Sequence, residues 1–492
     1  YFVTDQVGLQ KLIQTSHEQY NTTSVIDVDW YTSLNVHENE RFNLIDLNRQ
    51  SGGGREFYGE LLNQQKRDTV ITFSLNNVRT DLFARCIVDM AANSGEVTSI
   101  QVTYANKPQT LKMSAISITD YHTKATTKKI SFTEKPVSDA NQTVGLQFNG
   151  ANGANAYLNY VELHVPCALK MQGNELPIVN TDYLGRSQAI RYNMESANSN
   201  IQIWCVTNGV DVELMPINHN GSTITWLGSN TTAECYVAVD VNGTNWRTPK
   251  KVGDVANQNL HALENIDYVI ICPEAFLEPS IRLAKKHEQI DGLTWAVVTE
   301  QQVFNEFSSG TPDASAYRWL MKMLYDKANG DLVKQPKNLL LMGSGTYDNR
   351  KLFSASGARQ LLTYQAVNST TETEAYATDD YFGFLEDNAG IYQGIFTDTR
   401  ALMNIGVGRL PARTLREAED VVEKICTYMD DRSLGKWKSQ ILFLADDGDH
   451  GLHVQTADGG AERLRRRNKD FIINKIYLDA HTQEVSAAGE SY

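Results

Sequence analysis

The sequence is poor in cysteine and proline and has no long apolar run. Its six cysteines lie far apart, with no Cys-x-x-Cys pair and no paired histidines, which argues against a zinc site and a disulfide framework. Cys205 and Cys235 fall in neighbouring predicted strands, and a disulfide between them is the alternative to two buried thiols, which we favour. No window approaches the roughly 20 apolar residues of a transmembrane helix. The chain starts at Tyr1 without a charged and then apolar leader, so we expect a signal peptide to be absent or already removed.

Basic charge is also scarce. The 492 residues include 59 acidic and 45 basic side chains, giving a net charge of -14, and the only dense basic run is 463–467. This balance argues against nucleic acid as a partner. The arginines of that run fall in a predicted helix, where a solvated face explains them better than an anion site does.

The first half of the chain is rich in predicted β-strands. Apolar and polar residues alternate over 69–75 and 156–165, as in half-buried strands. Turn-forming Asn-Gly pairs separate such runs at short, regular spacing, which indicates antiparallel sandwiches. A chain of this length divides into two to four domains. We therefore expect a β-sandwich-like domain over residues 1–180 and a second, small β domain over residues 181–258.

From Asp267 onward, strands and helices alternate. The run 267–273 is a continuous apolar strand stopped by Pro273, as buried parallel strands are. Alternation of this kind requires a parallel sheet with right-handed crossovers. We expect one α/β subdomain over 259–413 and the start of a second over 414–492, with a sheet that is incomplete as given. The predicted strands are 267–273, 294–299, 338–343, 440–445 and 471–478, and the predicted helices are 276–290, 312–328 and 460–470.

Residues 404–419 contain a strand, a Gly-rich turn and the start of a helix. Thr414 is a natural N-cap residue and Glu417 follows three positions later, which is the pattern of a capping box. Apolar residues then recur at three- and four-residue spacing, so we predict a helix over about 415–429 with one face on a sheet.

Two loops that follow predicted strands have residues able to bind a ligand, because working residues of open α/β sheets lie beyond the carboxyl ends of the strands. The loop 343–349 begins Gly-Ser-Gly but lacks the third glycine and the downstream acidic residue of a nucleotide site. Asp379 and Asp380 precede aromatic residues and have the chemistry to bind a cation or a basic substrate side chain. From the residues alone, an acidic turn with an aromatic anchor is favoured.

A third loop contains Asp446, Asp447 and Asp449. Three carboxylates this close together suit a hard cation such as calcium, although the spacing is not that of an EF-hand. His450 also follows a predicted strand, as a peptidase base would, and Cys272 ends another. We favour a structural loop over a His450–Cys272 dyad, because no lysine or unambiguous histidine near Cys272 in the sequence would lower its pKa.

Four motifs in order carry a family resemblance. They are N-L-L-L-M-G-S-G at 338–345, T-D-D-Y-F-G at 378–383, I-G-V-G-R-L-P-A at 405–412 and I-L-F-L-A-D-D-G-D at 441–449, with His453 after the last. The succession resembles gingipain-type cysteine peptidases over roughly 260–492. The resemblance implies a caspase-like pair of α/β subdomains whose catalytic His and Cys come from the second one. Neither catalytic motif occurs in residues 1–492, so we expect both residues downstream, with His450 as a decoy.

The resemblance also implies roles for the acidic loops and for the protein. Asp379 and Asp380 lie beside the substrate cleft by family position, and Asp446, Asp447 and Asp449 form a possible structural calcium site, with no other cofactor required. Within the family the sequence is most similar to the sortases of the type IX secretion system. These act at the bacterial cell surface, held at the outer membrane by a β-barrel partner. They remove the C-terminal signal domains of cargo proteins and join the cargo to a lipopolysaccharide anchor.

Two other functions remain open at this level. A secreted gingipain-like endopeptidase would cleave proteins without joining them to an anchor. A non-enzymatic surface adhesin or glycan-binding protein would use its β domains for binding and its α/β part as a scaffold.

Overall fold

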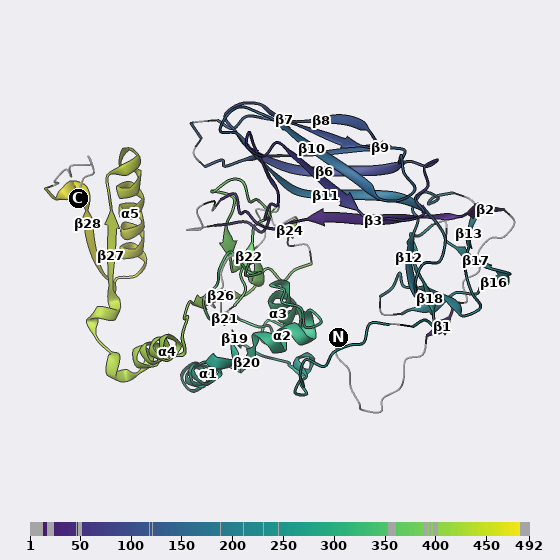
Figure 1. The fold of residues 1–492 in the computed structure, drawn as a ribbon. Coiled ribbons are helices and arrows are strands. Elements are labelled where there is room, and N and C mark those ends of the chain that lie inside the picture. Colours follow the sequence, from purple (N-terminus) through teal and green to yellow (C-terminus); the bar gives the residue numbers. More distant parts are fainter. Residues whose placement is uncertain are drawn as a thin grey trace.

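The computed structural model contains a β-rich N-terminal region followed by an α/β region (Figure 1). The predicted fold class is therefore confirmed. None of the helices in the described part of the chain combines the length and hydropathy needed to cross a lipid bilayer. The structure describes residues 13–16, 24–45, 47, 52–117, 119–120, 122–186, 188–209, 211–229, 231–244, 246–352, 361–387, 389, 391–392, 395–396 and 402–482.

A sandwich of two antiparallel sheets forms most of the N-terminal region. The alternating runs predicted as strands form β5 (Asp68–Phe73) and β11 (Asn155–Ala168). Strand β11 lies inside its sheet, between β3 (Trp30–Glu38) and β6 (Ala84–Asn93). One sheet has the order β3 (Trp30–Glu38), β11 (Asn155–Ala168), β6 (Ala84–Asn93) and β9 (Thr126–Glu134), with β4 (Leu61–Leu62) beside β11. The other has the order β5 (Asp68–Phe73), β10 (Gln142–Asn149), β7 (Thr98–Tyr104) and β8 (Lys107–Met113).

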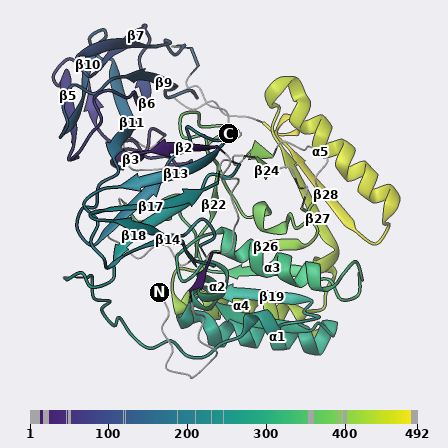
Figure 2. The same ribbon diagram turned by 90° about the vertical axis from the view of Figure 1, so that its right-hand side faces the viewer.

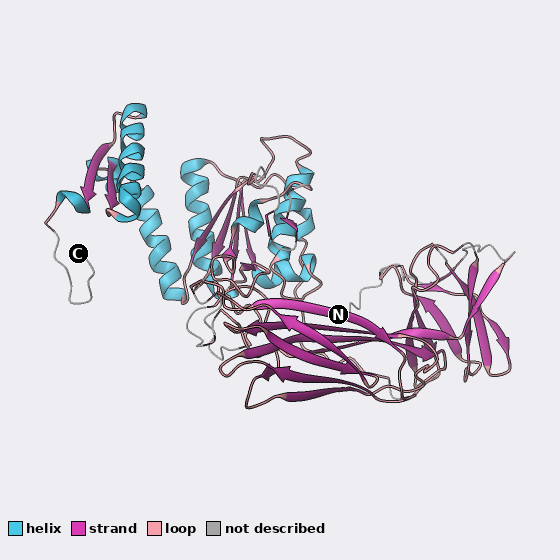
Figure 3. Ribbon diagram, turned by 90° about the horizontal axis from the view of Figure 1, so that it is seen from above, coloured by secondary structure: helices cyan, strands magenta, loops and turns pink. Residues whose placement is uncertain are grey.

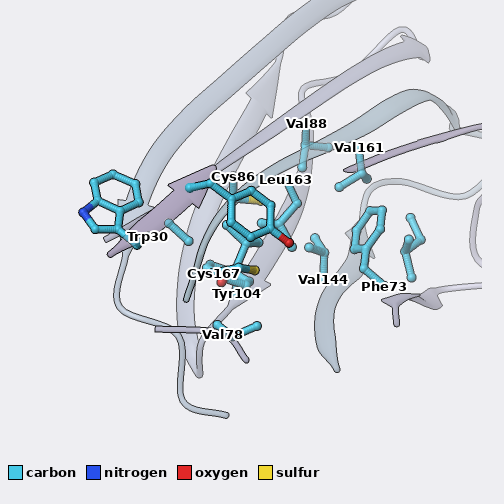
Figure 4. Close-up of a cluster of buried hydrophobic side chains, with 14 of the residues drawn as sticks. Trp30, Phe73, Val78, Cys86, Val88, Tyr104, Val144, Val161, Leu163 and Cys167 are labelled. Atoms are coloured by element: carbon cyan, nitrogen blue, oxygen red, sulfur yellow. The ribbon is translucent and has the colours of Figure 1, made fainter. Parts of the chain in front are cut away.

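Alternate side chains of the two sheets face each other and form the sandwich core (Figure 4). Val88, Leu163 and Val144 are buried there, as the period of two along a strand requires. The hydroxyl group of Tyr104 is also buried, and it donates a hydrogen bond of 3.1 Å to the side-chain oxygen of Gln142. This bond satisfies a polar group that would otherwise cost free energy inside the core.

Two smaller sheets continue the β region. A stacked pair, Tyr192 and Trp226, lies between them with ring centroids 5.0 Å apart. Strands from before residue 180 take part in both sheets, so pairing crosses the boundary predicted there. One sheet has the order β1 (Gln14–Thr15), β15 (Glu213–Leu214), β14 (Ile201–Cys205), β18 (Cys235–Asp240) and β12 (Glu175–Val179). The other has the order β16 (Asn218–Asn220), β17 (Thr223–Gly228), β13 (Ala189–Met194) and β2 (Val25–Val28).

All six cysteines are free thiols, including Cys205 and Cys235, for which a disulfide was the alternative. The prediction that these two are buried was wrong, because both are only partly buried. Burial raises the pKa of Cys167 from 9.0 to about 11, and a rise of two units lowers the thiolate fraction about 100-fold. We expect iodoacetamide at pH 8 to modify Cys205 and Cys235 in the folded protein about 100-fold faster than the buried Cys86, Cys167 and Cys272. Peptide mass spectrometry would measure this, with the urea-unfolded protein as the control in which all six react. Equal rates in the folded protein would contradict the prediction.

The α/β region is built on a four-stranded parallel sheet with the order β20 (Trp295–Thr299), β19 (Tyr268–Cys272), β21 (Asn338–Met342) and β26 (Gly406–Leu410). Side chains on one face of the sheet, such as Val269, pack on α2 (Glu300–Phe307) and α3 (Ser315–Lys327). Side chains on the opposite face, such as Ile270, pack on α1 (Leu277–Asp291) and α4 (Leu415–Met429). Both faces are therefore covered by helices, as parallel sheets require (Figure 2).

The helix predicted over about 415–429 is confirmed, with the predicted capping box: the Glu417 amide donates to the Thr414 hydroxyl, and the Glu417 side chain accepts from the Thr414 amide. Helix α2 was missed. Its capping box, Thr299 with Gln302, directly follows a buried strand. Because no loop residues separate the strand from the helix, the sequence shows no clear start for α2.

A second unit follows α4. Strands β27 (Gln440–Ala445) and β28 (Ile472–Tyr477) pair in parallel, and α5 (Gly448–Arg467) connects them. In Figure 3 this unit lies beyond α4, away from the sandwich. The helix expected at 460–470 begins twelve residues earlier, and its first turn is interrupted by left-handed backbone at Asp449, His450 and Gly451.

Candidate functional site

An arginine at the carboxyl end of the four-stranded sheet organises the loops around it. Arg409 of β26 makes a two-pronged ion pair with Asp379, in which Nε and Nη2 lie 2.7 Å from the two carboxylate oxygens. The same guanidinium donates 2.9 Å hydrogen bonds to the backbone carbonyls of Gly343 and Leu362. Its side chain is only 13% exposed. Arg409 thus joins the ends of β21 and β26 to the long segment that connects them.

The contacts of Arg409 make the two neighbouring aspartates differ, since among the described residues Asp379 is paired and Asp380 is not. Asp379 is held by Arg409 with its side chain 23% exposed, so its charge is already balanced within the protein. The side chain of Asp380 is exposed and makes no hydrogen bond or ion pair with the part of the chain that the structure describes. Only its backbone is tied, through a 3.1 Å hydrogen bond from its amide to the Thr378 hydroxyl. Of the two residues predicted beside a substrate cleft, Asp380 is the one free to meet a cationic group.

Aromatic packing fixes the turn that presents Asp380. The short helix η3 (Asp380–Gly383) places Tyr381 on Tyr364, with ring centroids 4.1 Å apart. Phe382 is fully buried and lies 5.4 Å from the ring of Tyr317 on α3. Arg318, also on α3, donates a hydrogen bond of 2.6 Å to the carbonyl of Phe384. The aromatic anchor expected from the sequence is therefore present, and it supports the acidic turn.

Side chains of the protein occupy the space beside the Gly-rich loop after β21. A Cβ atom at Gly345 would overlap the side chain of Thr363. The Asn349 amide group donates a 2.6 Å hydrogen bond to the Thr363 carbonyl, and the Thr363 hydroxyl donates one of 3.0 Å to Thr346. The glycine thus serves close packing against residues 361–365 and does not form a phosphate cradle.

The second acidic loop is organised around a histidine. Asp446 accepts a short hydrogen bond from Nδ1 of His453, and a carboxylate oxygen of Asp449 lies 3.3 Å from Nε2 of the same ring. Asp447 is the N-cap residue of α5 but makes no side-chain capping bond. Across the described residues, no group of three or more acidic, His or Cys side chains is arranged to hold a metal ion. The carboxylates of Asp446 and Asp449 contact His453 in this arrangement, and the calcium ion stays a prediction.

This cluster predicts a pH effect. The hydrogen bond and charge of Asp446, with a smaller contribution from Asp449, raise the pKa of His453 above 6.5. Because the pKa is higher in the folded state, this contribution to stability is complete below the unfolded-state pKa and is lost as pH rises through the folded-state value. We expect an NMR titration midpoint for His453 above 6.5 that falls toward 6.5 in Asp446→Asn. Asp447→Asn should leave it unchanged, and an unaltered midpoint in Asp446→Asn would refute the assignment.

The structure also shows where Cys272 and His450 lie, the two residues of the dyad that the sequence did not favour. Cys272 ends β19 fully buried in the packing between the sheet and helices α1 and α4. Burial raises the pKa of its thiol to about 11, whereas a nucleophilic cysteine needs a lowered pKa. His450 lies in the left-handed turn of α5, in the separate two-stranded unit.

Residues 261–492 match the family model described as peptidase family C25. This α/β region is therefore similar to the peptidases of family C25. The chain as a whole is similar to dimeric latent PorU from Porphyromonas gingivalis, with 25% identity and a TM-score of 0.73 over 91% of this chain and 44% of that one. The chain thus spans less than half the length of PorU.

A further match is the complex of the RgpB pro- and mature domains from Porphyromonas gingivalis, at 17% identity over 43% of this chain and 41% of that chain. Its TM-score is 0.28, so it adds nothing to the assignment. No curated protein matches the sequence.

Arg409 was not predicted as a site residue, although it lies within one of the motifs that carry the resemblance. The available signal was a single charged residue inside an otherwise apolar strand that ends just before Pro411. Such a charge is costly unless it is paired, and the motif at 378–383 supplied the only adjacent pair of aspartates in the loops of the first subdomain.

Proposed function

We propose that this chain is part of a cell-surface cysteine peptidase that acts as a sortase of the type IX secretion system. It would remove C-terminal signal domains from cargo proteins and join the cargo to a lipopolysaccharide anchor, while an outer-membrane β-barrel partner holds it at the membrane. The support is the similarity to PorU along 91% of the chain, together with the C25 match of the α/β region. The catalytic His and Cys are expected after residue 492, in the second α/β subdomain.

The reaction proposed is acyl transfer. The cysteine thiolate attacks the carbonyl carbon of the cargo peptide bond, the C–N bond breaks, and the signal domain leaves as a protonated amine. An amino group of the anchor then attacks the thioester, forming an amide and releasing the thiolate. Backbone N–H groups that stabilise the oxyanion in each step are expected in the same second subdomain.

Residues 1–492 would contribute substrate binding to this reaction. The exposed carboxylate of Asp380 lies on the turn beyond the carboxyl ends of the strands, where ligands of open α/β sheets bind. It would receive a basic side chain of the cargo. Arg409 balances the charge of Asp379, so a single carboxylate acts as the recognition group.

The test uses the full-length protein and a peptide that joins a cargo segment to its C-terminal signal domain. Mass spectrometry of the products with an added amine acceptor separates the three functions. A cargo–amine adduct supports the sortase, hydrolysis alone supports the endopeptidase, and an uncleaved peptide supports the adhesin. Prior alkylation should abolish cleavage in the first two cases. The variant Cys272→Ala should cleave like the parent, since Cys272 is buried away from solvent.

A further inference from the structure

Three consecutive glycines of the N-terminal sandwich region lie against the α/β region. At Gly52 a Cβ atom would overlap the Tyr347 ring, at Gly53 the Ala375 carbonyl, and at Gly54 the Asn368 carbonyl and the Ser369 side chain. Two of these neighbours are backbone atoms, which cannot move aside as the end of a flexible side chain can. We call this contact, with the bonds that flank it, the glycine seam. Only glycine allows two backbones to come this close.

Hydrogen bonds from the two residues that follow the glycines join the same two parts of the chain. The Arg55 amide donates to the Ala366 carbonyl at 3.0 Å, and the Glu56 amide donates to the Ser369 hydroxyl at 2.9 Å. Asn43, fully buried, donates a 2.9 Å bond to the Gly53 carbonyl and so holds the glycine turn from behind.

A second row of contacts comes from the loop before β9. The Lys124 amide donates to the Thr370 carbonyl at 2.7 Å, and the Glu372 amide donates to the His122 carbonyl at 3.0 Å. The Lys124 ammonium group lies 2.8 Å from the Glu372 carboxylate. Backbone pairing of this kind fixes position and register more firmly than an exposed ion pair does.

Arg350 closes the seam at its edge. It pairs with Glu40, donates a 3.2 Å hydrogen bond to the Arg55 carbonyl, and lies 5.2 Å above the ring of Phe57. All these contacts end on residues 347–375 of the connection between β21 and β26. Figure 1 shows β22 (Tyr364–Gln365), which belongs to this connection, directly beside the sandwich.

The same connection continues into the acidic turn. Strand β22 pairs with β23 (Ala377–Thr378), and Asp379 and Asp380 follow immediately. At one end Arg409 holds Asp379 and Leu362 to the sheet, and at the other the glycine seam holds 366–375 to the sandwich. Asp380 is therefore positioned from two sides: from the α/β region by Arg409 and the aromatic anchor, and from the sandwich by the glycine seam.

We propose that the N-terminal β-sandwich is a working part of the substrate cleft, because the glycine seam positions the β22–β23 hairpin and hence Asp380. Gly53 and its neighbours are positioning residues, and Asp380 is the specificity-determining residue for a cationic substrate side chain. This inference rests on the proposed peptidase function. The sandwich is then more than a spacer or an anchoring module.

The experiment uses the full-length protein with Gly53→Ala, whose new Cβ must displace the Ala375 backbone, and Arg350→Ala as a milder second variant. Gly253→Ala is the matched control, because a Cβ there meets nothing within 4 Å. Two peptides are compared that differ only in a basic or a neutral side chain before the scissile bond. We expect KM for the basic peptide to rise about tenfold in Gly53→Ala, with kcat and the neutral peptide changed less than about twofold. Asp380→Asn should give the same pattern.

Hydrogen exchange separates a positioning role from general destabilisation. Peptides covering 361–387 should exchange faster in both seam variants, while those from β19 and α1 stay as in the parent. Faster exchange with unchanged KM for both peptides would overturn this inference and leave the proposed function standing, as would unchanged exchange and kinetics in both variants. If the parent protein cleaves neither peptide nor the cargo peptide, the proposed function fails, and the inference with it. Should Gly53→Ala not fold, Arg350→Ala decides.

Discussion

Replacing Arg409 with alanine is expected to destabilise the α/β region by about 3 kcal/mol, the lower end of the cost of leaving one partner of a buried ion pair alone, because this pair is partly exposed. The variant removes both bonds to Asp379 and those to the carbonyls of Gly343 and Leu362. Asp379 would then keep its charge in a largely enclosed position without a counter-ion. Native-state hydrogen exchange of peptides from β21 and β26 measures the free energy of opening directly.

Arg416→Ala is the matched control for that experiment. Its side chain is 89% exposed and lies 3.8 Å from Asp420, a surface pair worth at most about 1 kcal/mol. We expect its opening free energies to stay within about 0.5 kcal/mol of the parent. If Arg409→Ala also changes the opening free energies by only about 0.5 kcal/mol, water replaces the guanidinium without loss of stability. The contacts of Arg409 would then not hold the loops in place.

Truncating Phe382 to alanine has the second large expected effect, about 3–5 kcal/mol of lost stability. The ring is fully buried among the side chains that cover the α2 and α3 face of the sheet. It lies 5.4 Å from the ring of Tyr317 and 5.6 Å from that of Tyr381. No polar group is removed, so the loss comes from transfer and from the cavity left behind. Urea unfolding followed by hydrogen exchange of α3 would measure it.

The control for Phe382→Ala is Leu332→Ala, at a side chain that is 78% exposed. A change within about 0.5 kcal/mol is expected there. Because Phe382 belongs to the helical turn that begins at Asp380, its truncation should also speed exchange across 378–385. Loss of stability without faster exchange in that turn would contradict an anchoring role for the ring.

The sequence predicted the elements of the α/β region well, because their signals are local. Pro273 follows a purely apolar run, and the strand ends at Cys272. Thr414 and Glu417 form the expected capping box, since a cap depends only on residues three apart. Strand β27 was placed at its observed bounds of 440–445. The late start predicted for α5 was wrong, because glycine and aspartate residues have weak helix propensity and yet lie within the observed helix.

The candidate site was predicted less completely, and the reason is physical. Asp379 and Asp380 are adjacent and identical in type, so no local rule distinguishes them. Their difference arises because Arg409, 30 residues away, reaches one of them and not the other. In the same way, nothing local to Gly52–Gly54 indicates what packs on them, because the residues at 368–375 come against them only when the chain folds.

The sequence by itself determined the fold class, the parallel sheet, the capped helix α4 and the similarity of 261–492 to peptidase family C25. These follow from periodicity, capping and motif order, which are properties of short segments. Only the tertiary structure decided which aspartate stays free, that Cys272 is a buried thiol with a raised pKa, and that Gly52–Gly54 lie against the connection between β21 and β26. Those outcomes depend on contacts between residues far apart in the chain, where burial and charge pairing set the free energy of each group.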